Sequence, residues 1–300
     1  MSQTQPPTSQ APVLSGHMPL ARYCVYSLAD KDADPRDGLR ALPEALSEGR
    51  ALLGLGAPVC AALGKPIDGL RTFPALSGAA VSVASTQGAL LVAAYGDDRG
   101  KLLHRSRAVD DALGESFVVD EVCDTFVYGE SQDLTGYEDG TENPEGAAAA
   151  RAALVRGRGD GLDGGSFVAV QRWIHDLDGF FDQSPRQRDF TIGRSRRTNE
   201  ELDEAPESAH VKRAAQESFD PEAFMVRRSM PFATEDDEGL LFVAFGDSLD
   251  RYERVLRRML GLEDGIVDGL FGFTRPTTGG YYFCPPLDEA GRVRLSVVGL

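Results

Sequence analysis

The sequence is poor in the residues from which the simplest site motifs are built. Its 300 residues include four histidines and four cysteines, and the cysteines, which form no C-x-x-C pair, are Cys24, Cys60, Cys123 and Cys284. Their spacing indicates neither a zinc site nor a disulfide framework, so reduced, buried thiols in a cytoplasmic protein are expected. G-x-S-x-G, H-E-x-x-H and kinase motifs are also missing, which disfavours a serine hydrolase and a zinc enzyme.

Basic residues and long apolar runs are scarce as well. The chain has 31 Lys and Arg against 47 Asp and Glu, a formal net charge of −16. Nucleic acid and anionic membrane surfaces are not expected as partners, because phosphate binding needs clustered Lys and Arg. No apolar run approaches the ~20 residues of a membrane span. Residues 1–16, MSQTQPPTSQAPVLSG, lack the basic and apolar regions of a signal peptide, and their composition predicts a disordered tail.

Two segments that lie 150 positions apart resemble each other. LLVAAYGDD at 90–98 and LLFVAFGDS at 240–248 align without a gap. Each begins with an apolar run typical of a buried strand. Each strand ends at a Gly-Asp pair, in which Asp97 and Asp247 are candidate N-caps of a following helix.

A helix and a further strand are predicted after each of these segments. The further strands are expected over 122–129 and 266–276. The apolar faces of the helices are Leu102, Leu103, Ala108 and Leu113 in the first, and Leu249, Tyr252, Leu256, Met259 and Leu260 in the second. Because strand, helix and strand occur in the same order twice, the sequence predicts an α+β protein of two similar halves, built of antiparallel sheets with helices.

The expected division of the chain is a tail over 1–16, a first domain over 17–135 and a second over 136–300. The second domain carries extra material between its repeated units. Residues 165–177 predict a strand, and 184–210 begin as a helix and continue as a loop. A long polar insertion of this kind in a compact domain is either disordered or functional.

The segment GYEDGTENPEG, residues 136–146, combines turn-forming residues with three acids. It is either an ordinary solvent-facing turn or a loop that holds one of its acids, Glu138, Asp139 or Glu142, where a proton has to be moved.

Of the four histidines, His210 is the candidate for a functional role. His17 borders the predicted tail, His104 lies in a helix whose counterpart has no histidine, and His175 is interpreted as a surface or capping residue at the end of a strand. His210 follows Pro206, a residue that can begin a short helix.

The segment FMVRRSMPF, residues 224–232, predicts a strand with two adjacent arginines. Residues i and i+2 of a strand share a face, so Arg227 and Ser229 lie on one face and Arg228 on the other. If one face is buried, the arginine on it needs an anionic partner. The alternative is an edge strand from which both arginines reach water.

Six blocks of the sequence resemble, in the same order, the dye-decolorising peroxidases, and within them the bacterial B-type branch. The blocks are GYEDGTENP, GGSFVAVQRWIHDL, IGRSRRTNEELDEAPESAHV, MVRRSMPF, GLLFVAFG and FTRPTTGGYYFCPPLD. The resemblance runs from about residue 17 to 290 and is strong from 130 onward. It implies a duplicated ferredoxin-like fold of two antiparallel sheets with helices, and a haem b (iron protoporphyrin IX) held mainly by the C-terminal half.

The resemblance also assigns roles to individual residues. His210 would be the ligand of the haem iron, and Asp139 and Arg227 the distal pair that acts on H2O2. Ser229 would share the face of Arg227, and Phe242 would pack over the distal side of the haem.

Two further residues are expected to support the cofactor. Asp268 is the predicted acceptor of a hydrogen bond from His210, which makes the imidazole more electron-rich. Arg194 is predicted to pair with a haem propionate by the bidentate geometry that arginine favours.

The function implied is that of a haem peroxidase. H2O2 would form a ferryl porphyrin-radical intermediate, and organic donors such as dyes and phenolics would reduce it in two one-electron steps. Which of Asp139 and Arg227 dominates the cleavage of the peroxide bond stays open. The alternative is a haem-handling protein, which binds or transfers haem or releases its iron, with incidental peroxidase activity.

Expectations about larger assemblies and electron transfer follow from the same resemblance. It implies a homo-oligomer, and packaging in a protein nanocompartment through the C-terminal segment AGRVRLSVVGL is an alternative that the sequence leaves open. Because bulky dyes do not reach a buried iron, surface aromatic residues would relay the radical, with Trp173, Tyr281 and Tyr282 as candidates.

Overall fold

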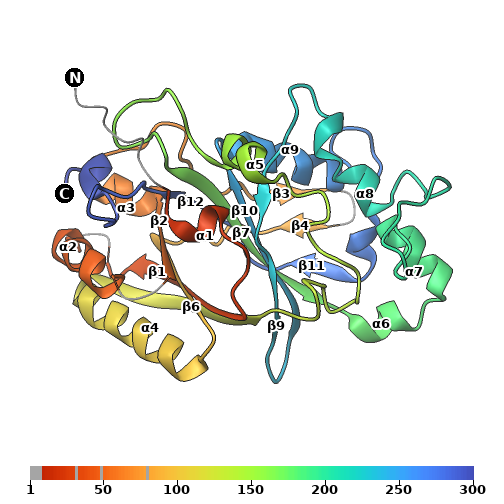
Figure 1. The fold of residues 1–300 in the computed structure, drawn as a ribbon, viewed down its shortest axis with the longest axis horizontal. Helices are drawn as coiled ribbons and strands as arrows, with labels where there is room; N and C mark the ends of the chain where they lie inside the picture. The colour runs from red at the N-terminus through yellow and green to blue at the C-terminus, as the bar shows by residue number, and fades with distance from the viewer. Residues whose placement is uncertain (1–8, 31–32, 48–49, 79–80) are drawn as a thin grey trace.

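The computed structural model describes residues 9–30, 33–47, 50–78 and 81–300. Most helices of the N-terminal half lie at one end of the molecule and most of those of the C-terminal half at the other, with the strands between them (Figure 1). The longer N-terminal helices are α2 (Arg36–Ala45), α3 (Ala57–Ala62) and α4 (Arg99–Leu113). The C-terminal half contains α5 (Gly146–Ala153), α6 (Leu177–Phe181), α7 (Pro185–Ile192), α8 (His210–Arg213) and α9 (Leu249–Met259).

Each half contributes four strands in the same spatial order. The N-terminal strands are β1 (Leu20–Leu28), β2 (Arg50–Gly56), β5 (Leu90–Gly96) and β6 (Phe117–Phe126), arranged β2-β5-β1-β6. The C-terminal strands are β7 (Ser166–His175), β9 (Met230–Ala233), β10 (Glu238–Gly246) and β12 (Gly280–Cys284), arranged β9-β10-β7-β12. The short strands β8 (Val226–Arg227) and β11 (Thr274–Pro276) extend the C-terminal set, and β3 (Leu76–Ser77) pairs with β4 (Ser82–Val83) alone.

The two predicted antiparallel sheets are joined at both edges and form one continuous sheet. Strand β12 pairs with β2 through Tyr282 and Gly56, and β6 pairs with β9 through Thr125 and Phe232. With the pairing of β7 and β10, the strands close into a ring, and every pair is antiparallel. Each half thus covers part of the open strand edges of the other half, which limits the unpaired backbone that separate sheets would expose.

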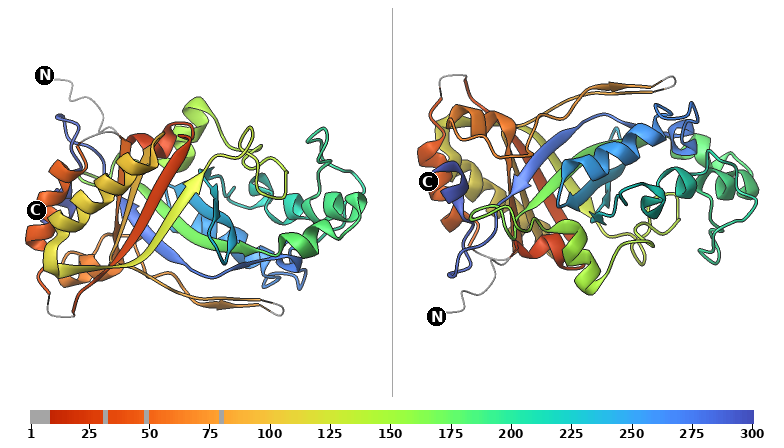
Figure 2. Two further views of the ribbon diagram at one scale, coloured as in Figure 1. Left: turned by 90° about the horizontal axis from the view of Figure 1, so that it is seen from below. Right: turned by 90° about the horizontal axis from the view of Figure 1, so that it is seen from above.

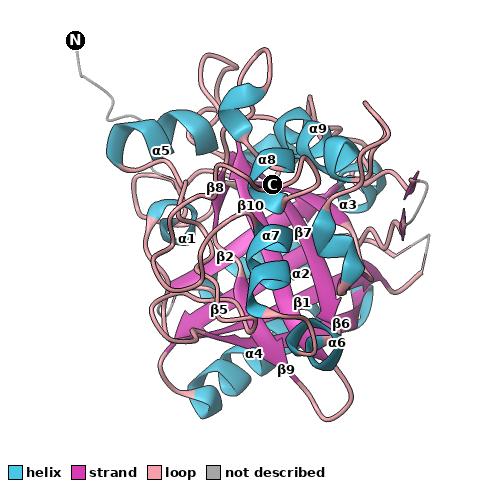
Figure 3. Cartoon of the chain, turned by 90° about the vertical axis from the view of Figure 1, so that its right-hand side faces the viewer, coloured by secondary structure: helices cyan, strands magenta, loops and turns pink. Residues whose placement is uncertain are grey.

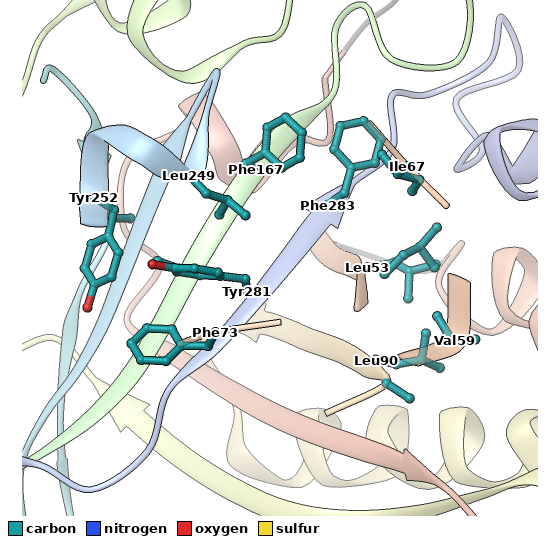
Figure 4. Packing of buried hydrophobic residues seen from close by; sticks show 14 of the residues in the cluster. Leu53, Val59, Ile67, Phe73, Leu90, Phe167, Leu249, Tyr252, Tyr281 and Phe283 are labelled. Atoms are coloured by element: carbon teal, nitrogen blue, oxygen red, sulfur yellow. The ribbon is translucent and has the colours of Figure 1, made fainter. Parts of the chain in front are cut away.

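Two cores follow from the alternation of side chains along these strands. On β7, Val168 and Val170 belong to a cluster made mainly of strand residues from both halves, which lies inside the ring. Phe167 and Ala169 face the opposite way, into a second cluster between the strands and the helices. This outer cluster is also shared by the halves, because it contains Leu53, Val59 and Leu90 of the N-terminal half together with Phe167, Tyr281 and Phe283 of the C-terminal half (Figure 4).

The helices α4 and α9 occupy equivalent places on the outer face of the ring (Figure 2). All five residues predicted for the apolar face of α9 are buried. In α4, Leu102 and Leu113 are buried as predicted, but Leu103 and Ala108 are exposed, and Val109 packs inward instead. The N-caps are Asp98 and Ser248, one position after the predicted Asp97 and Asp247.

The tail predicted over 1–16 is ordered where the structure describes it, from residue 9. Helix α1 (Ala11–Leu14) packs Val13 into the inner cluster. The side chain of Gln10 donates to the carbonyls of Leu53 and Pro285, each at 2.9 Å, and accepts from the N–H of Leu53 at 2.7 Å. These tertiary contacts order a segment whose composition favours disorder. Residues 1–8 lie outside the described part of the chain.

The strand predicted over 266–276 is wrong except at Thr274–Pro276. Asp268 accepts a hydrogen bond from the N–H of Leu270 and caps a 3-10 helix, Gly269–Gly272, which interrupts the extended chain. The last main strand of this half is β12, whereas the strands predicted over 165–177 and 122–129 are present as β7 and as the end of β6. Among the described residues, no helix is long and apolar enough to cross a bilayer.

Candidate active site

The cavity that contains most of the predicted site residues, called the main cavity from here on, lies between the outer face of the C-terminal strands and the helices that cover them. It encloses about 980 Å³ including its mouth. Strands β7, β8 and β10 form one side, α8 and α9 contribute another, and the loop before α5 completes the wall. Figure 3 views this end of the molecule, where α7 and α8 lie in front of the strands. Its apolar lining includes Leu240, Phe242, Val255, Leu256, Met259 and Leu270.

His210 is the first residue of α8 and lines this cavity. Its Nδ1 lies 2.8 Å from Oδ2 of Asp268, whose side chain is fully buried. The other oxygen of Asp268 accepts from the N–H of Leu270 at 2.8 Å. Because the ionised carboxylate only accepts, Nδ1 of His210 donates, which leaves the lone pair of Nε2 for a ligand.

Asp139 reaches the cavity from the loop that precedes α5. Gly136 and Gly140 have φ values of 81° and 79°, which side chains disfavour, so both turns of the loop need glycine. The N–H of Asp139 donates to the carbonyl of Ser131 at 3.1 Å. The neighbouring acids have other tasks: Glu138 accepts from Asn199 at 2.7 Å, and Glu142 is exposed.

Arg227 and Arg228 point to opposite faces, as the strand pattern predicts. Strands β8 and β9 pair with β10 in one continuous register, in which Arg227 faces Ala244 and Met230 faces Leu241. Arg227 lines the cavity, and its buried Nε has no hydrogen-bond partner among the described residues. Arg228 instead donates to the carbonyls of Ser15 and Leu14 at the end of α1, at 2.9 and 3.3 Å.

Two of the predicted cofactor residues lie away from the main cavity. Arg194 donates to the carboxylates of Glu142 and Glu201, at 2.8 and 2.5 Å, and is not among the described residues that line the cavity. The guanidinium of Arg194 is thus already paired with two carboxylates of this chain, whereas an arginine that binds a propionate is expected to be free of such partners. Ser229 is buried and lines a smaller hollow next to the main cavity. Asp139 lines this smaller hollow as well.

His175 lines the cavity too, and the interpretation of it as a surface or capping residue is wrong. It is 9% exposed, with Nε2 3.0 Å from Oδ2 of Asp133 and Nδ1 2.6 Å from Oγ1 of Thr274. Gln171 and Trp173 stand on the same face of β7, at i−4 and i−2 from His175. Because Gln171, Trp173 and His175 occupy alternate positions of QRWIH, the sequence itself indicates that they share one face of the strand.

Buried donors without partners cluster in this cavity. Besides Nε of Arg227, the Nε2 of Gln171 and the Nε1 of Trp173 have no hydrogen-bond partner within the described ranges. Buried polar groups are nearly always paired, so three such donors around one cavity indicate a ligand that accepts hydrogen bonds. No group of three or more His, Cys, Asp or Glu side chains that would hold a bare metal ion is found in the described part of the chain.

The aromatic residues predicted to relay radicals at the surface are buried. Trp173 is 6% exposed, Tyr281 0% and Tyr282 1%. Of the three, only Trp173 lines the cavity, where its ring stacks on Phe271 with centroids 5.5 Å apart. None of the three is therefore a surface contact for a bulky donor.

Comparison with known proteins gives a consistent result. The family model described as "Dyp-type peroxidase, C-terminal" matches residues 130–289, more than half of the chain. The dye-decolorizing peroxidase of Mycolicibacterium paratuberculosis is 32% identical over 188 residues, which are 61% of this chain and 53% of the relative. The match thus spans about half the length of that protein.

Solved structures are similar over nearly the whole chain. The dye-decolorizing protein from V. cholerae superposes with a TM-score of 0.81 at 28% identity, covering 92% of this chain and 97% of that one. A variant of DypB from Rhodococcus jostii RHA1 in complex with heme gives a TM-score of 0.82 at 27% identity, covering 91% and 94%.

Proposed function

The chain belongs to the Dyp-type peroxidase family, and from this premise we propose that it is a haem-dependent peroxidase. It would reduce H2O2 and oxidise organic donors such as dyes and phenolics in one-electron steps. The observation that carries the proposal is the cavity in which His210, Asp139 and Arg227 meet, each from a different element. The shared strand order of the two halves supports the finer description of the fold as a duplicated ferredoxin-like unit.

The residues of the cavity fit a haem. Its walls are largely apolar, as a porphyrin requires, and His210 offers Nε2 to the iron because Asp268 engages Nδ1. Arg227 would supply a donor to an oxygen ligand through its unpaired Nε. When bound, haem supplies the redox centre that takes two oxidising equivalents from H2O2 and returns them one at a time to donors.

The chain's own contribution is the movement of one proton and the stabilisation of charge. The carboxylate of Asp139 takes a proton from one oxygen of H2O2 and delivers it to the other, so that the second oxygen leaves as water. The guanidinium of Arg227 stays charged and stabilises the negative charge that builds on the departing oxygen. Asp268 keeps the imidazole of His210 in one tautomer and orientation.

Substitution of His210 tests the cofactor assignment. We expect His210→Ala to lose most of its haem, measured as the haem-to-protein ratio after reconstitution and as the position of the Soret band. Full retention of haem with an unchanged Soret band would contradict the assignment of the iron ligand.

Substitution of the distal pair separates a peroxidase from a haem-handling protein. We expect Asp139→Ala and Arg227→Ala to keep haem but to react with H2O2 at least about 100-fold more slowly in stopped-flow mixing. The larger of the two losses identifies the dominant residue. The control is Glu145→Ala, an exposed acid in the same loop. If both distal variants react as fast as the wild type while His210→Ala loses haem, the haem-handling function is favoured instead.

Three further features stay predictions that accompany the proposal. A homo-oligomer and packaging in a nanocompartment are expected only from the family. The pairing of Arg194 with a propionate would require its ion pairs with Glu142 and Glu201 to break. A cytoplasmic location is supported by the cysteines, all four of which are buried and unpaired.

A further inference from the structure

The side chain of Asn143 fastens the loop of Asp139 to the strand of Arg227. Its Nδ2 donates to the carbonyl of Arg227 at 3.0 Å, and its Oδ1 accepts from the N–H of the same residue at 2.8 Å. A neighbouring antiparallel strand would make the same reciprocal pair of bonds. One amide thus substitutes for a strand at this position.

The backbone of Arg227 is available because β8 ends the order of strands in the sheet. The next residue, Arg228, donates its N–H to the carbonyl of Val243 on β10 at 2.8 Å. Since successive residues of a strand direct their N–H and C=O groups to opposite sides, those of Arg227 point away from β10. Without Asn143 the N–H of Arg227 would lose its hydrogen-bond partner, whereas its carbonyl would keep the bond from Nη1 of Arg228 at 3.0 Å.

Gly140 makes room for this amide. A Cβ at Gly140 would lie 2.6 Å from Nδ2 of Asn143. The N–H of Asn143 donates to the carbonyl of Gly140 at 2.9 Å, so the turn that begins after Asp139 closes on Asn143 itself. A displacement of Asn143 is therefore transmitted directly to Asp139.

We propose that Asn143 is a positioning residue that sets where the carboxylate of Asp139 stands relative to the guanidinium of Arg227. Asn143 is absent from the described residues that line the main cavity, so it acts through the backbone and not on the reactants. The inference rests on the proposed function, because only a haem peroxidase gives Asp139 and Arg227 a common ligand. The loop has a second attachment, from Asn199 to Glu138 and Thr141 at 2.7 and 2.9 Å, which keeps it folded when Asn143 is removed.

Equilibrium binding of fluoride to the haem-loaded protein tests this inference without turnover. A distal arginine donates to the bound anion, so the Kd for fluoride, read from the Soret band, reports where the guanidinium stands. We expect Asn143→Ala to raise this Kd by about tenfold or more, since this is the order of the loss when a hydrogen bond to a charged group is broken. The double variant Asn143→Ala with Arg227→Ala should bind no more weakly than Arg227→Ala alone.

The matched control is Gln187→Ala. This substitution also removes an amide that binds a backbone N–H, that of Ser184 at 3.0 Å, but at an exposed helix start outside the cavity. Its Kd for fluoride should equal that of the wild type. If Asn143→Ala fails to fold, Asn143→Ser takes its place with the same expectation.

The outcomes separate this inference from the proposed function. A normal Kd in Asn143→Ala beside a raised Kd in Arg227→Ala overturns the positioning role and leaves the peroxidase proposal intact. A double variant that binds more weakly than Arg227→Ala also overturns it, because Asn143 would then act independently. An unchanged Kd in Arg227→Ala overturns the role of the arginine itself and the inference with it.

Discussion

Asp133 is an acid that the fold keeps ionised beside the cavity. Burial on its own would raise the pKa of this carboxyl. The carboxyl accepts hydrogen bonds from His175, whose charge also acts on it, and from the hydroxyl and the N–H of Thr135. Together these interactions outweigh burial and lower the pKa of Asp133 below the ordinary 3.8. A group with a lowered pKa stabilises the folded state above its unfolded pKa, and this contribution is lost as the pH falls through the folded pKa.

Asp133→Asn should therefore destabilise the protein in a pH-dependent way. We expect the free energy of unfolding to fall by about 1–3 kcal/mol at neutral pH, as for loss of hydrogen bonds to a charged group. The difference from the wild type should shrink as the pH falls below about 4, where the wild-type carboxyl is protonated in the unfolded chain. Urea unfolding at pH 7 and pH 3 measures this, with the exposed Asp236→Asn as control. A difference that is constant with pH would contradict it.

Residues whose types and order were distinctive could be predicted from the sequence to share one site. His210, Asp139, Arg227 and Phe242 all line one cavity, and Asp268 stands behind His210. Arg194 differs because two acids of this chain, Glu142 and Glu201, bind its guanidinium. Such pairing depends on how two loops meet, which no local pattern encodes. Asn143 was overlooked for the same reason, since its partner is 84 positions away.

Helix α1 shows how a few hydrogen bonds order an element too short to be stable alone. Its four residues contain no capping side chain. Gln10, just before the helix, is 3% exposed and bonds to the backbone of two distant segments. Arg228 holds the carbonyls at the other end. Tertiary contacts override the composition of the segment.

Gln10→Ala should lower the free energy of unfolding by about 1–3 kcal/mol, because the N–H of Leu53 loses its bond to the Gln10 side chain in a buried place. The midpoint of urea unfolding, followed by circular dichroism, measures the loss. Gln183→Ala, in the turn between α6 and α7, provides the comparison. Equal midpoints for the two variants would show that the hydrogen bonds of Gln10 add nothing to stability.

The strands β5 and β10 and the helix α9 were predictable because each has a strong periodic pattern. The interruption at 266–276 was not, since Asp268 serves both as a cap and as the partner of His210. A polar residue with two tertiary tasks imposes a turn on a stretch whose apolar content favours a strand. The prediction of the element type is wrong here because the proposed site requires Asp268 to make these two contacts.

The closed ring makes the two halves of the molecule interdependent. Both clusters of buried apolar residues contain members from each half. Pairing of β12 with β2 and of β6 with β9 joins the halves at two seams. The repeated sequence predicted two similar units, but pairing between strands far apart in the chain leaves no local pattern, so the ring itself was not predictable.

The haem-free chain is therefore expected to unfold in one cooperative step. Trp173 is the only tryptophan and lies in the C-terminal half, whereas circular dichroism reports on both halves. The two signals should give the same urea midpoint, because neither half keeps its core when the other unfolds. Two separated midpoints would show that the halves are independent domains with a boundary near residue 135.

The neighbours Arg227 and Arg228 give the protein an unexpected sensitivity at its N-terminus. The two residues are adjacent in the chain: Arg227 lines the cavity, and Arg228 donates hydrogen bonds to the carbonyls of Leu14 and Ser15. A chain shortened to begin at residue 17 would remove both of these carbonyls, and the guanidinium of Arg228 would keep, among the described residues, only its bond to the carbonyl of Arg227. A cut more than two hundred positions away in sequence would then change the surroundings of a residue that lines the cavity.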